Sequence, residues 1–274
     1  MMNLEVARAR KRDNRIPIHG PEAFAGMHKA GQLAAAGLDL LVDKIAPGVA
    51  TEVLDDLIFE FAMDHGAYPA PLYYRGFPKS ICTSINHVVC HGIPGDKPMR
   101  DGDIVNIDIT LIVDGWHGDT SRMFPVGNVS RRAERLMEVT YESLMLGVAA
   151  AKPGNTTGDI GAAIQKFAEG ERCSIVRDFC GHGLGQVFHD RPNILHYGSE
   201  DEGTKLQPGM IFTIEPMVNL GRPQVKVLND GWTAVTRDRS LSAQFEHSIG
   251  ITEDGCEIFT TSPAGLHCPP YTTA

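Results

Sequence analysis

The order of predicted elements repeats once along the chain, and this duplication constrains the fold more than any other feature. Two Pro-Gly pairs, Pro47-Gly48 and Pro153-Gly154, each end one predicted helix and precede another. Further on, Asp108 and Glu215 each follow a glycine by six residues within a strand-like run. The prolines are 106 residues apart and the acids 107. This nearly constant offset predicts two copies of one unit that face each other across a shared cleft. The alternative is a chance recurrence, since helices in many mixed proteins end at Pro-Gly.

Each copy is expected to contain two helices. In the first copy they run from Pro21 to about residue 46 and from Thr51 to about residue 65. In the second copy they run from Arg131 to about residue 152 and from Thr157 to about residue 170. Thr51 and Thr157 each follow their Pro-Gly pair at the place where an N-cap is expected.

The composition is that of an ordinary globular protein. The 274 residues are 42% hydrophobic, with no run near the roughly 18 apolar residues that a membrane span needs. The net charge of -9 argues against a nucleic-acid binder, and so against specific DNA as a partner, but leaves room for a cation. Six scattered cysteines without a secretory signal indicate a reduced compartment. We therefore expect a cytoplasmic protein without membrane contact.

The first sixteen residues differ from the rest because they carry a local charge of +3. The basic side chains are Arg8, Arg10, Lys11, Arg12 and Arg15. We interpret residues 1–16 as a solvated N-terminal tail. The alternative is a docking arm for an anionic partner such as the ribosome surface. Residues 17–274 are expected to form a single domain.

A hairpin is predicted where two strand-like runs, Ile104 to Val113 and Trp116 to Phe124, flank Asp114-Gly115. A two-residue turn pairs Thr110 with Asp119, which places Asp119 on the same face as Asp108 and diagonal to it, at about 7 to 8 Å. A three-residue loop would shift the register by one and move Asp119 to the opposite face.

Four acids lie in strand-like segments without a neighbouring row of Lys or Arg. They are Asp108, Asp119, Glu215 and Glu246. A single such acid is often explained by a solvated sheet face or an ion pair, but four buried carboxylates need a shared positive charge. Divalent metal is the economical source, and the imidazole of His182 in a Gly-His-Gly segment extends the choice from Mn, Mg, Fe or Co to Zn. A loop histidine can also serve a local hydrogen bond. Further imidazoles are offered by His91 and His189.

Six segments together resemble the successive motifs of type I methionine aminopeptidases, in their short bacterial-style form. They are Cys90-His91-Gly92-Ile93-Pro94, Asn106-Ile107-Asp108, His117-Gly118-Asp119-Thr120-Ser121, Gly181-His182-Gly183-Leu184-Gly185, Phe212-Thr213-Ile214-Glu215-Pro216 and Ala243-Gln244-Phe245-Glu246-His247. The resemblance implies the α+β pita-bread fold, an antiparallel sheet flanked by helices in two pseudosymmetric halves. These halves would span about 20–125 and 126–262 of one peptidase domain.

The resemblance also assigns the site. It implies two divalent metal ions per chain (Co, Mn, Fe or Zn), held by Asp108, Asp119, His182, Glu215 and Glu246. Asp119 and Glu246 would bridge both ions, His182 and Glu215 would complete one, and Asp108 would bind the other. The implied catalytic residues are His91, His189 and Glu215. The implied substrate-binding residues are His91 and His189, with Tyr74, Phe77, Cys82, Phe188 and Trp232 lining the methionine pocket.

The implied activity is metal-dependent removal of the N-terminal methionine from peptides and nascent chains, with a small second residue preferred, by a monomer. Pro71 and Phe77 depart from the Cys and Tyr expected in many bacterial relatives, which bears on the outer pocket. The 31-residue gap between Glu215 and Glu246 has no room for the insertion that marks type II enzymes. Two alternatives stay open: a proline-specific pita-bread peptidase and a non-catalytic peptide-binding pita-bread module.

Overall fold

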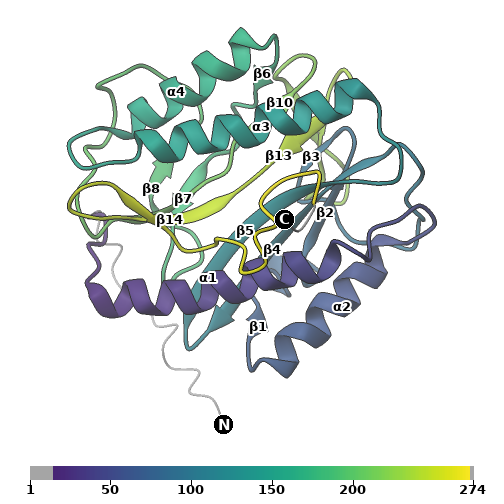
Figure 1. Cartoon of the computed structure of the whole chain (residues 1–274), viewed down its shortest axis with the longest axis horizontal. Coiled ribbons are helices and arrows are strands. Elements are labelled where there is room, and N and C mark those ends of the chain that lie inside the picture. The colour runs from purple at the N-terminus through teal and green to yellow at the C-terminus, as the bar shows by residue number, and fades with distance from the viewer. Residues whose placement is uncertain (1–14, 272–274) are drawn as a thin grey trace.

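Four helices cover a set of antiparallel strands in the computed structural model, of which residues 15–271 are described (Figure 1). Helices α1 (Pro21–Leu41) and α2 (Thr51–Asp64) lie on one side of the strands, and α3 (Arg131–Ala150) and α4 (Thr157–Gly170) lie on the other. The predicted elements are present in the predicted order. None of the helices in this part of the chain is long and apolar enough to cross a membrane.

The helix boundaries differ from the predictions in detail. Helix α1 ends five residues early, at Leu41. Both predicted caps were wrong by one position: Ala50 precedes α2 without a side-chain cap, and Thr156, not Thr157, caps α4. Thr156 forms a capping box with Asp159, which satisfies two free backbone N–H groups.

The strands form several antiparallel sheets. One sheet contains β1 (Tyr68–Pro69), β2 (Cys82–Ile85), β4 (Ile104–Val113) and β5 (Trp116–Pro125). A five-stranded sheet has the order β15 (Cys256–Ile258), β14 (His247–Ile251), β9 (Ile211–Ile214), β7 (Gly181–Gly183) and β8 (Asp190–Ile194). Two three-stranded sheets contain β13 (Ser242–Gln244), β10 (Met217–Asn219) and β6 (Ser174–Ile175), and β11 (Val225–Val227), β12 (Ala234–Thr236) and β3 (Val88–Cys90). The expected α+β class with antiparallel pairing is confirmed.

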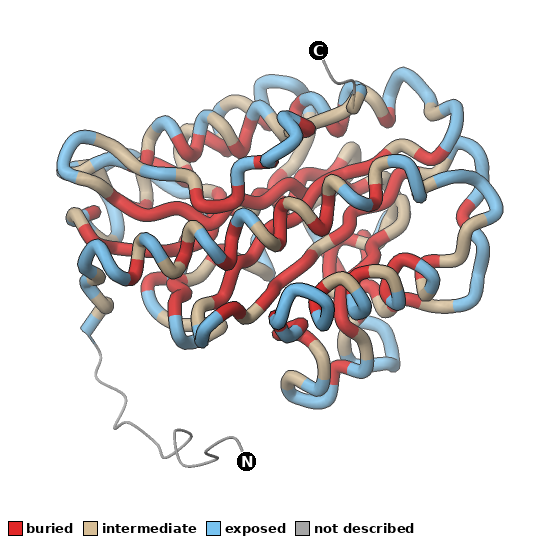
Figure 2. Tube along the Cα trace, turned by 60° about the horizontal axis from the view of Figure 1, so that its bottom comes forward, coloured by how far each residue is buried: buried red, intermediate tan, exposed pale blue. Residues whose placement is uncertain are grey.

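Two large apolar clusters fill the space between helices and strands. The first lies among α1, α2 and the inward face of β4, which carries Val105, Ile107, Ile109, Leu111 and Val113 as the alternation predicts. The second lies beneath α3 and α4 and also takes in Ile104 and Met123 of the first hairpin. Figure 2 shows these buried segments running through the middle of the molecule. Both clusters therefore include residues of the β4–β5 hairpin, which also carries Asp108 and Asp119.

The N-terminal tail can be followed only in part. Of the predicted tail, residues 1–14 lie outside the described residues. Ile16 is partly buried and packs against the second apolar cluster. Ile16, the last residue of the predicted tail, therefore contacts the domain.

Candidate metal centre

The β4–β5 hairpin has the predicted register. Asp114 and Gly115 form a two-residue turn with φ of 50° and 85°, the left-handed conformations of a type I′ turn. Thr110 pairs with Asp119, and Asp108 pairs with Ser121. Since side chains alternate along a strand, Asp108 and Asp119 lie on the same face of the sheet, diagonally opposed. The predicted pairing of Thr110 with Asp119 is confirmed.

Three other segments bring their acidic or imidazole side chains to this face. His182 lies in the middle of β7, Glu215 directly follows β9, and Glu246 lies between β13 and β14. The Glu246 segment is fastened to β5, because its backbone N–H donates to the carbonyl of Ser121 (3.0 Å) and its carbonyl accepts from the hydroxyl of Thr120 (2.8 Å). These two hydrogen bonds hold the Glu246 segment beside β5, although the two segments are far apart in the sequence.

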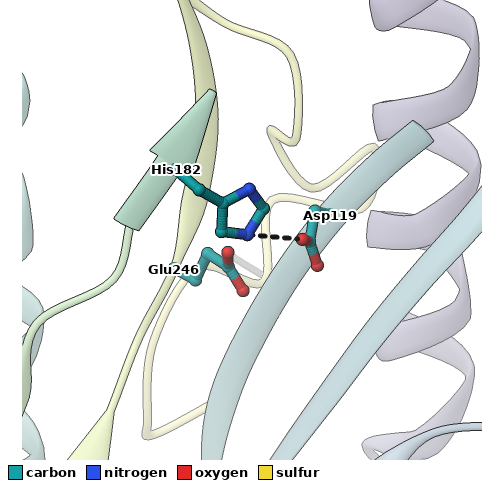
Figure 3. Close-up of side chains that lie close together, drawn as sticks. All are labelled: Asp119, His182 and Glu246. Atoms are coloured by element: carbon teal, nitrogen blue, oxygen red, sulfur yellow. Dashed lines mark ion pairs between the residues drawn. The ribbon is translucent and has the colours of Figure 1, made fainter. Parts of the chain in front are cut away.

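The side chains converge tightly enough to share an ion. Asp119, His182 and Glu246 each present one ligand atom, and the three atoms lie within 4.8 Å of one another (Figure 3). The His182 Nε2 atom is 3.6 Å from Asp119 Oδ2 and 3.7 Å from Glu215 Oε1. Asp108 lines the same cavity. All five side chains predicted to bind metal are therefore gathered at one place.

The electrostatics of this cluster favour a bound cation. Burial, reinforced by the neighbouring acids, holds the pKa values of Asp108, Glu215 and Glu246 well above their ordinary range. Burial also raises the pKa of Asp119 to about 7. Ionising all four carboxylates together requires positive charge close by. Arg75 is the one Lys or Arg among the described residues that line the cavity. When ionised, the four carboxylates therefore carry excess negative charge, which divalent cations would neutralise.

The histidine complements this set of oxygen ligands. Burial lowers the pKa of His182 to about 4, so its ring is neutral at physiological pH and able to bind metal through nitrogen. Four carboxylates and one imidazole form a donor set suited to Mn, Fe, Co or Zn. The residues present therefore fit a divalent metal site.

Hydrogen bonds that the motifs did not single out orient two of the carboxylates. The hydroxyl of Thr110 donates to Asp119 (2.6 Å), and that of Thr213 donates to Glu215 (2.7 Å). The side-chain amide of Gln244 donates to the other Glu215 oxygen (3.2 Å). Thr110 could have been found from the sequence, because the predicted register already placed it opposite Asp119.

A buried histidine also contacts the acid segment. The imidazole of His196 is fully buried, and its Nε2 atom accepts a hydrogen bond from the backbone N–H of Glu215 (3.0 Å). No sequence motif marked this residue. It holds the backbone of Glu215 where β9 ends before Pro216.

A cavity of about 400 Å³ opens onto the carboxylates and contains every residue predicted for the site. Beyond the five ligand candidates, its walls include His91, His189, Tyr74, Phe77, Cys82, Phe188 and Trp232. Phe77 and Trp232 meet edge to face with ring centroids 5.2 Å apart. The lining that the sequence did not predict includes Cys90, Phe179, Met217 and Gln244. The cavity therefore combines aromatic and sulfur-containing side chains with the acidic cluster.

Both remaining histidines lie at this cavity. His91 follows β3 with a φ of 56°, and its ring packs edge to face against Phe179 (5.4 Å). Burial lowers the pKa of His91. The His189 ring lies 4.2 Å from the His182 ring, at the exposed rim of the cavity. Partial desolvation and the neighbouring His182 and His91 lower the pKa of His189. Neutral rings of this kind can donate one hydrogen bond to a substrate.

A second cavity, of about 710 Å³, lies between α3 and residues 268–270. Its lining includes Glu134, Glu138 and Glu142 but no histidine and none of the predicted site residues. Size alone therefore does not mark the functional site, and the smaller cavity carries the convergent polar groups.

Comparison with known proteins places these features in context. The model of metallopeptidase family M24 matches residues 25–253. The methionine aminopeptidase of Rickettsia prowazekii (strain Madrid E) is 57% identical over 257 residues, covering 93% of this chain and 99% of that protein. A crystal structure of methionine aminopeptidase from Rickettsia prowazekii superposes with a TM-score of 0.89 and covers 90% of this chain and 100% of that one. Prolidase from Pyrococcus furiosus, 22% identical, has a TM-score of 0.72 and covers 91% of this chain and 66% of that one, a likeness of fold alone.

Proposed function

This chain belongs to metallopeptidase family M24, and on that basis we propose that it removes the N-terminal methionine from peptides and nascent proteins. Its fold is the pita-bread fold that the sequence motifs implied. One observation carries the proposal: the chain is 57% identical to a methionine aminopeptidase along almost the whole length of both proteins. The gathering of all predicted site residues around one cavity supports it.

We propose that the five ligand candidates, Asp108, Asp119, His182, Glu215 and Glu246, hold two divalent ions. Asp119 and Glu246 would bridge both ions, His182 and Glu215 would complete one, and Asp108 would bind the other. The close approach of Asp119, His182 and Glu246 supports this assignment, as does the presence of four carboxylates beside a single Lys or Arg, Arg75, among the described residues that line the cavity. Bound ions of this class supply Lewis-acid polarisation of a carbonyl and an acidified water.

Glu215 is positioned to move a proton during hydrolysis. One of its carboxylate oxygens accepts from Thr213 and the other from Gln244, so the group is held in a fixed orientation. Desolvation and the neighbouring acids raise its pKa, which makes the carboxylate a stronger base than an exposed glutamate. In this proposal Glu215 takes a proton from water and delivers it to the leaving amine.

We propose that His91 and His189 stabilise the oxygen on which negative charge develops during the reaction. His91 and His189 line the cavity as neutral rings, and each can donate a hydrogen bond to oxygen that becomes negative as the peptide bond is attacked. Donors fixed before the reaction cost no reorganisation when that charge develops. We assign both residues to substrate binding and to stabilisation of the reacting group.

The apolar walls define the class of side chain that is accepted. Tyr74, Phe77, Cys82, Phe188 and Trp232 provide aromatic and sulfur surface, which suits a flexible, polarizable thioether. Pro71 and Phe77 replace polar or thiol side chains on this wall, so the outer pocket is more apolar than the motif pattern predicts. Methionine is the natural occupant of such a pocket.

The two alternative functions receive less support. The likeness to prolidase is one of fold, and this chain covers 66% of that protein. A non-catalytic peptide-binding module has no need of a complete set of four acids and one imidazole.

We propose further that the protein acts as a monomer in the cytoplasm, and that the basic tail, if it docks to the ribosome surface, does so apart from catalysis.

The test is a metal-dependent assay on three peptides. The protein is stripped with a chelator, reloaded separately with Mn, Fe, Co or Zn, and offered Met-Ala-Ser, Leu-Ala-Ser and Ala-Pro. We expect release of methionine from the first peptide only, and only after reloading. Cleavage of Ala-Pro instead would favour the proline-specific alternative, and the absence of cleavage with every metal would favour the binding module.

A further inference from the structure

We propose that Tyr74 is a positioning residue, whose hydroxyl fixes the tautomer of His189 and so determines which ring nitrogen carries the proton offered to the substrate. This inference rests on the proposed function and deepens it. It assigns to Tyr74 a role beyond that of pocket wall, carried by one hydrogen bond and by the turn that presents the phenol.

The hydrogen bond joins the two residues across the cavity wall. The Tyr74 Oη atom lies 3.0 Å from His189 Nδ1, and the two rings stack with centroids 5.2 Å apart and an angle of 27° between their planes. Tyr74 also contacts Phe188, at 5.0 Å between ring centroids. The phenol is therefore held over His189 on two sides, and its polar end meets the ring at Nδ1.

The turn that carries Tyr74 is built to hold this position. Its neighbours Tyr73 and Arg75 both have left-handed backbone conformations, with φ of 63° and 48°, which side chains other than glycine rarely adopt. Backbone hydrogen bonds close the turn in both directions, from the N–H of Tyr73 to Phe77 and from the N–H of Phe77 to Tyr74. Strained residues of this kind persist where the surrounding structure requires them, often at functional sites.

The direction of the hydrogen bond follows from the chemistry of the two groups. A neutral imidazole has one nitrogen that donates and one that accepts. The phenol O–H is the more acidic donor of the pair, so it donates to the Nδ1 lone pair. The proton of the ring then resides on Nε2. The arrangement gives His189 a fixed N–H donor instead of a mixture of two tautomers.

The tautomer of His189 should affect kcat more than substrate binding. A ring in the wrong tautomer presents a lone pair where the reacting oxygen needs a donor. Substrate fills the cavity through the methionine side chain, which contacts the phenol ring whether or not the hydroxyl is present. Removal of the hydroxyl should therefore lower kcat and leave KM nearly unchanged.

The principal test compares Tyr74→Phe with Tyr73→Phe in the metal-loaded enzyme. Tyr73 is the adjacent residue, 75% exposed, and does not line the cavity, so it is a matched control. We expect kcat on Met-Ala-Ser to fall about tenfold in Tyr74→Phe, a part of the 10²–10⁴ that a positioned proton donor contributes. KM should change by less than about twofold, and Tyr73→Phe should match the wild type. An unchanged kcat in Tyr74→Phe would overturn the proposal.

A spectroscopic measurement tests the tautomer directly and needs no catalysis. In ¹⁵N-histidine-labelled, metal-free protein, the protonated and unprotonated ring nitrogens are distinguished by chemical shift, with His189 assigned through the His189→Gln variant. We expect His189 to carry its proton on Nε2 in the wild type and to populate both tautomers in Tyr74→Phe. A wild-type ring protonated on Nδ1 would overturn the proposal without reference to any variant.

Combining the two substitutions separates a positioning role from a merely structural one. If Tyr74 acts through His189, adding Tyr74→Phe to His189→Ala should cause no further loss of kcat. Independent, multiplicative losses would contradict the proposal. If the wild type fails to cleave any methionine peptide, the proposed function fails, whereas the tautomer measurement still decides the role of Tyr74.

Discussion

Thr110 and Asp119 lie directly opposite each other on the β4–β5 hairpin, and the threonine hydroxyl donates a 2.6 Å hydrogen bond to the aspartate. Both residues are almost fully buried. The hydrogen bond fixes the rotation of the carboxylate about its own bonds, so that one oxygen is occupied and the other faces His182.

Replacing Thr110 with valine should therefore weaken metal binding without removing a ligand. We expect affinity for the more weakly bound ion to fall by about 10- to 100-fold, the usual effect of losing a group that orients a metal ligand. Thr110→Ser keeps the hydroxyl and should stay near the wild type. Calorimetric titration of chelator-treated protein with Mn or Co measures the difference, and equal affinities in Thr110→Val and the wild type would contradict it.

Removing a bridging carboxylate should have a larger effect. Asp119→Asn and Glu246→Gln keep the size of each side chain but remove the charge, so we expect loss of two-metal loading and at least a 10³-fold fall in kcat/KM, comparable to the loss of an essential catalytic group. Metal content by elemental analysis checks the first effect. Asp114→Asn, at the exposed turn of the same hairpin, is the matched control and should retain both ions. Full activity of Asp119→Asn without metal would refute the ligand assignment.

The metal-free protein should become less stable as pH rises from 6.5 to 8. The buried acids have folded-state pKa values raised above their unfolded values, so the folded form holds more protons, and stability is lost as pH rises through this range. The pKa of His182 is lowered to about 4, and burial also lowers the pKa values of His91, His189, His196 and His247. These rings favour folding as pH rises and oppose the trend, but their contribution is nearly complete by about pH 7.5. Thermal melts at the two pH values measure the change.

Added metal and the Asp119→Asn variant are the controls for these thermal melts. Divalent metal should abolish most of the loss at pH 8, because the cations compensate the ionised acids. Asp119→Asn should show a smaller pH dependence than wild type in the metal-free state. An Asp119→Asn variant with the same pH dependence as the wild type in chelator would contradict the raised pKa assigned to Asp119.

The size of the second substrate residue should limit cleavage. The cavity of about 400 Å³ lies at the small end of ligand pockets and is shared by the methionine side chain and the reacting groups. We expect Met-Ala-Ser and Met-Gly-Ser to be cleaved at least 10²-fold faster than Met-Leu-Ser, a discrimination within reach of steric exclusion. Comparison of kcat/KM values for the three peptides is decisive, and equal values would exclude a crowded site.

Deletion of residues 2–14 should leave the cleavage of small peptides intact. Every residue of the proposed site lies between Pro71 and Glu246, and Ile16, which packs against the second apolar cluster, is retained. We expect kcat/KM on Met-Ala-Ser within about twofold of wild type, since distant changes usually act independently. A large loss of activity with unchanged thermal stability would assign the tail to the catalytic machinery.

The sequence predicted the hairpin well because its register depends on local chemistry. A two-residue turn at Asp114-Gly115 fixes every pair along β4 and β5, so Asp108 and Asp119 could be placed on one face without further information. Helix starts were less certain. Thr51 is the first residue of α2 and not its N-cap, and its hydroxyl accepts from the backbone N–H of Gly95, a contact between segments that no local pattern shows.

The rest of the site depends on contacts between distant segments. Gln244 donates to Glu215 across 29 residues of sequence, and His196 accepts from the same segment across 19. Separations of 29 and 19 residues are too long for contacts within one helix or hairpin. Only the tertiary structure or a family motif can therefore reveal these two contacts. The duplicated offset predicted that Asp108 and Glu215 occupy equivalent places. It could not specify that His182 would meet Asp119, because β7 lies in a different sheet from β5.

The attachment of Glu246 to β5 has a consequence for the protein during its own synthesis. Asp108 and Asp119 leave the ribosome early, but Glu246 follows more than a hundred residues later, and its backbone is bonded to Thr120 and Ser121 of β5. Until then the two aspartates lack one of their proposed partners in metal binding. We therefore expect a growing copy of this chain to be inactive, and its own first residue to be removed by a completed copy.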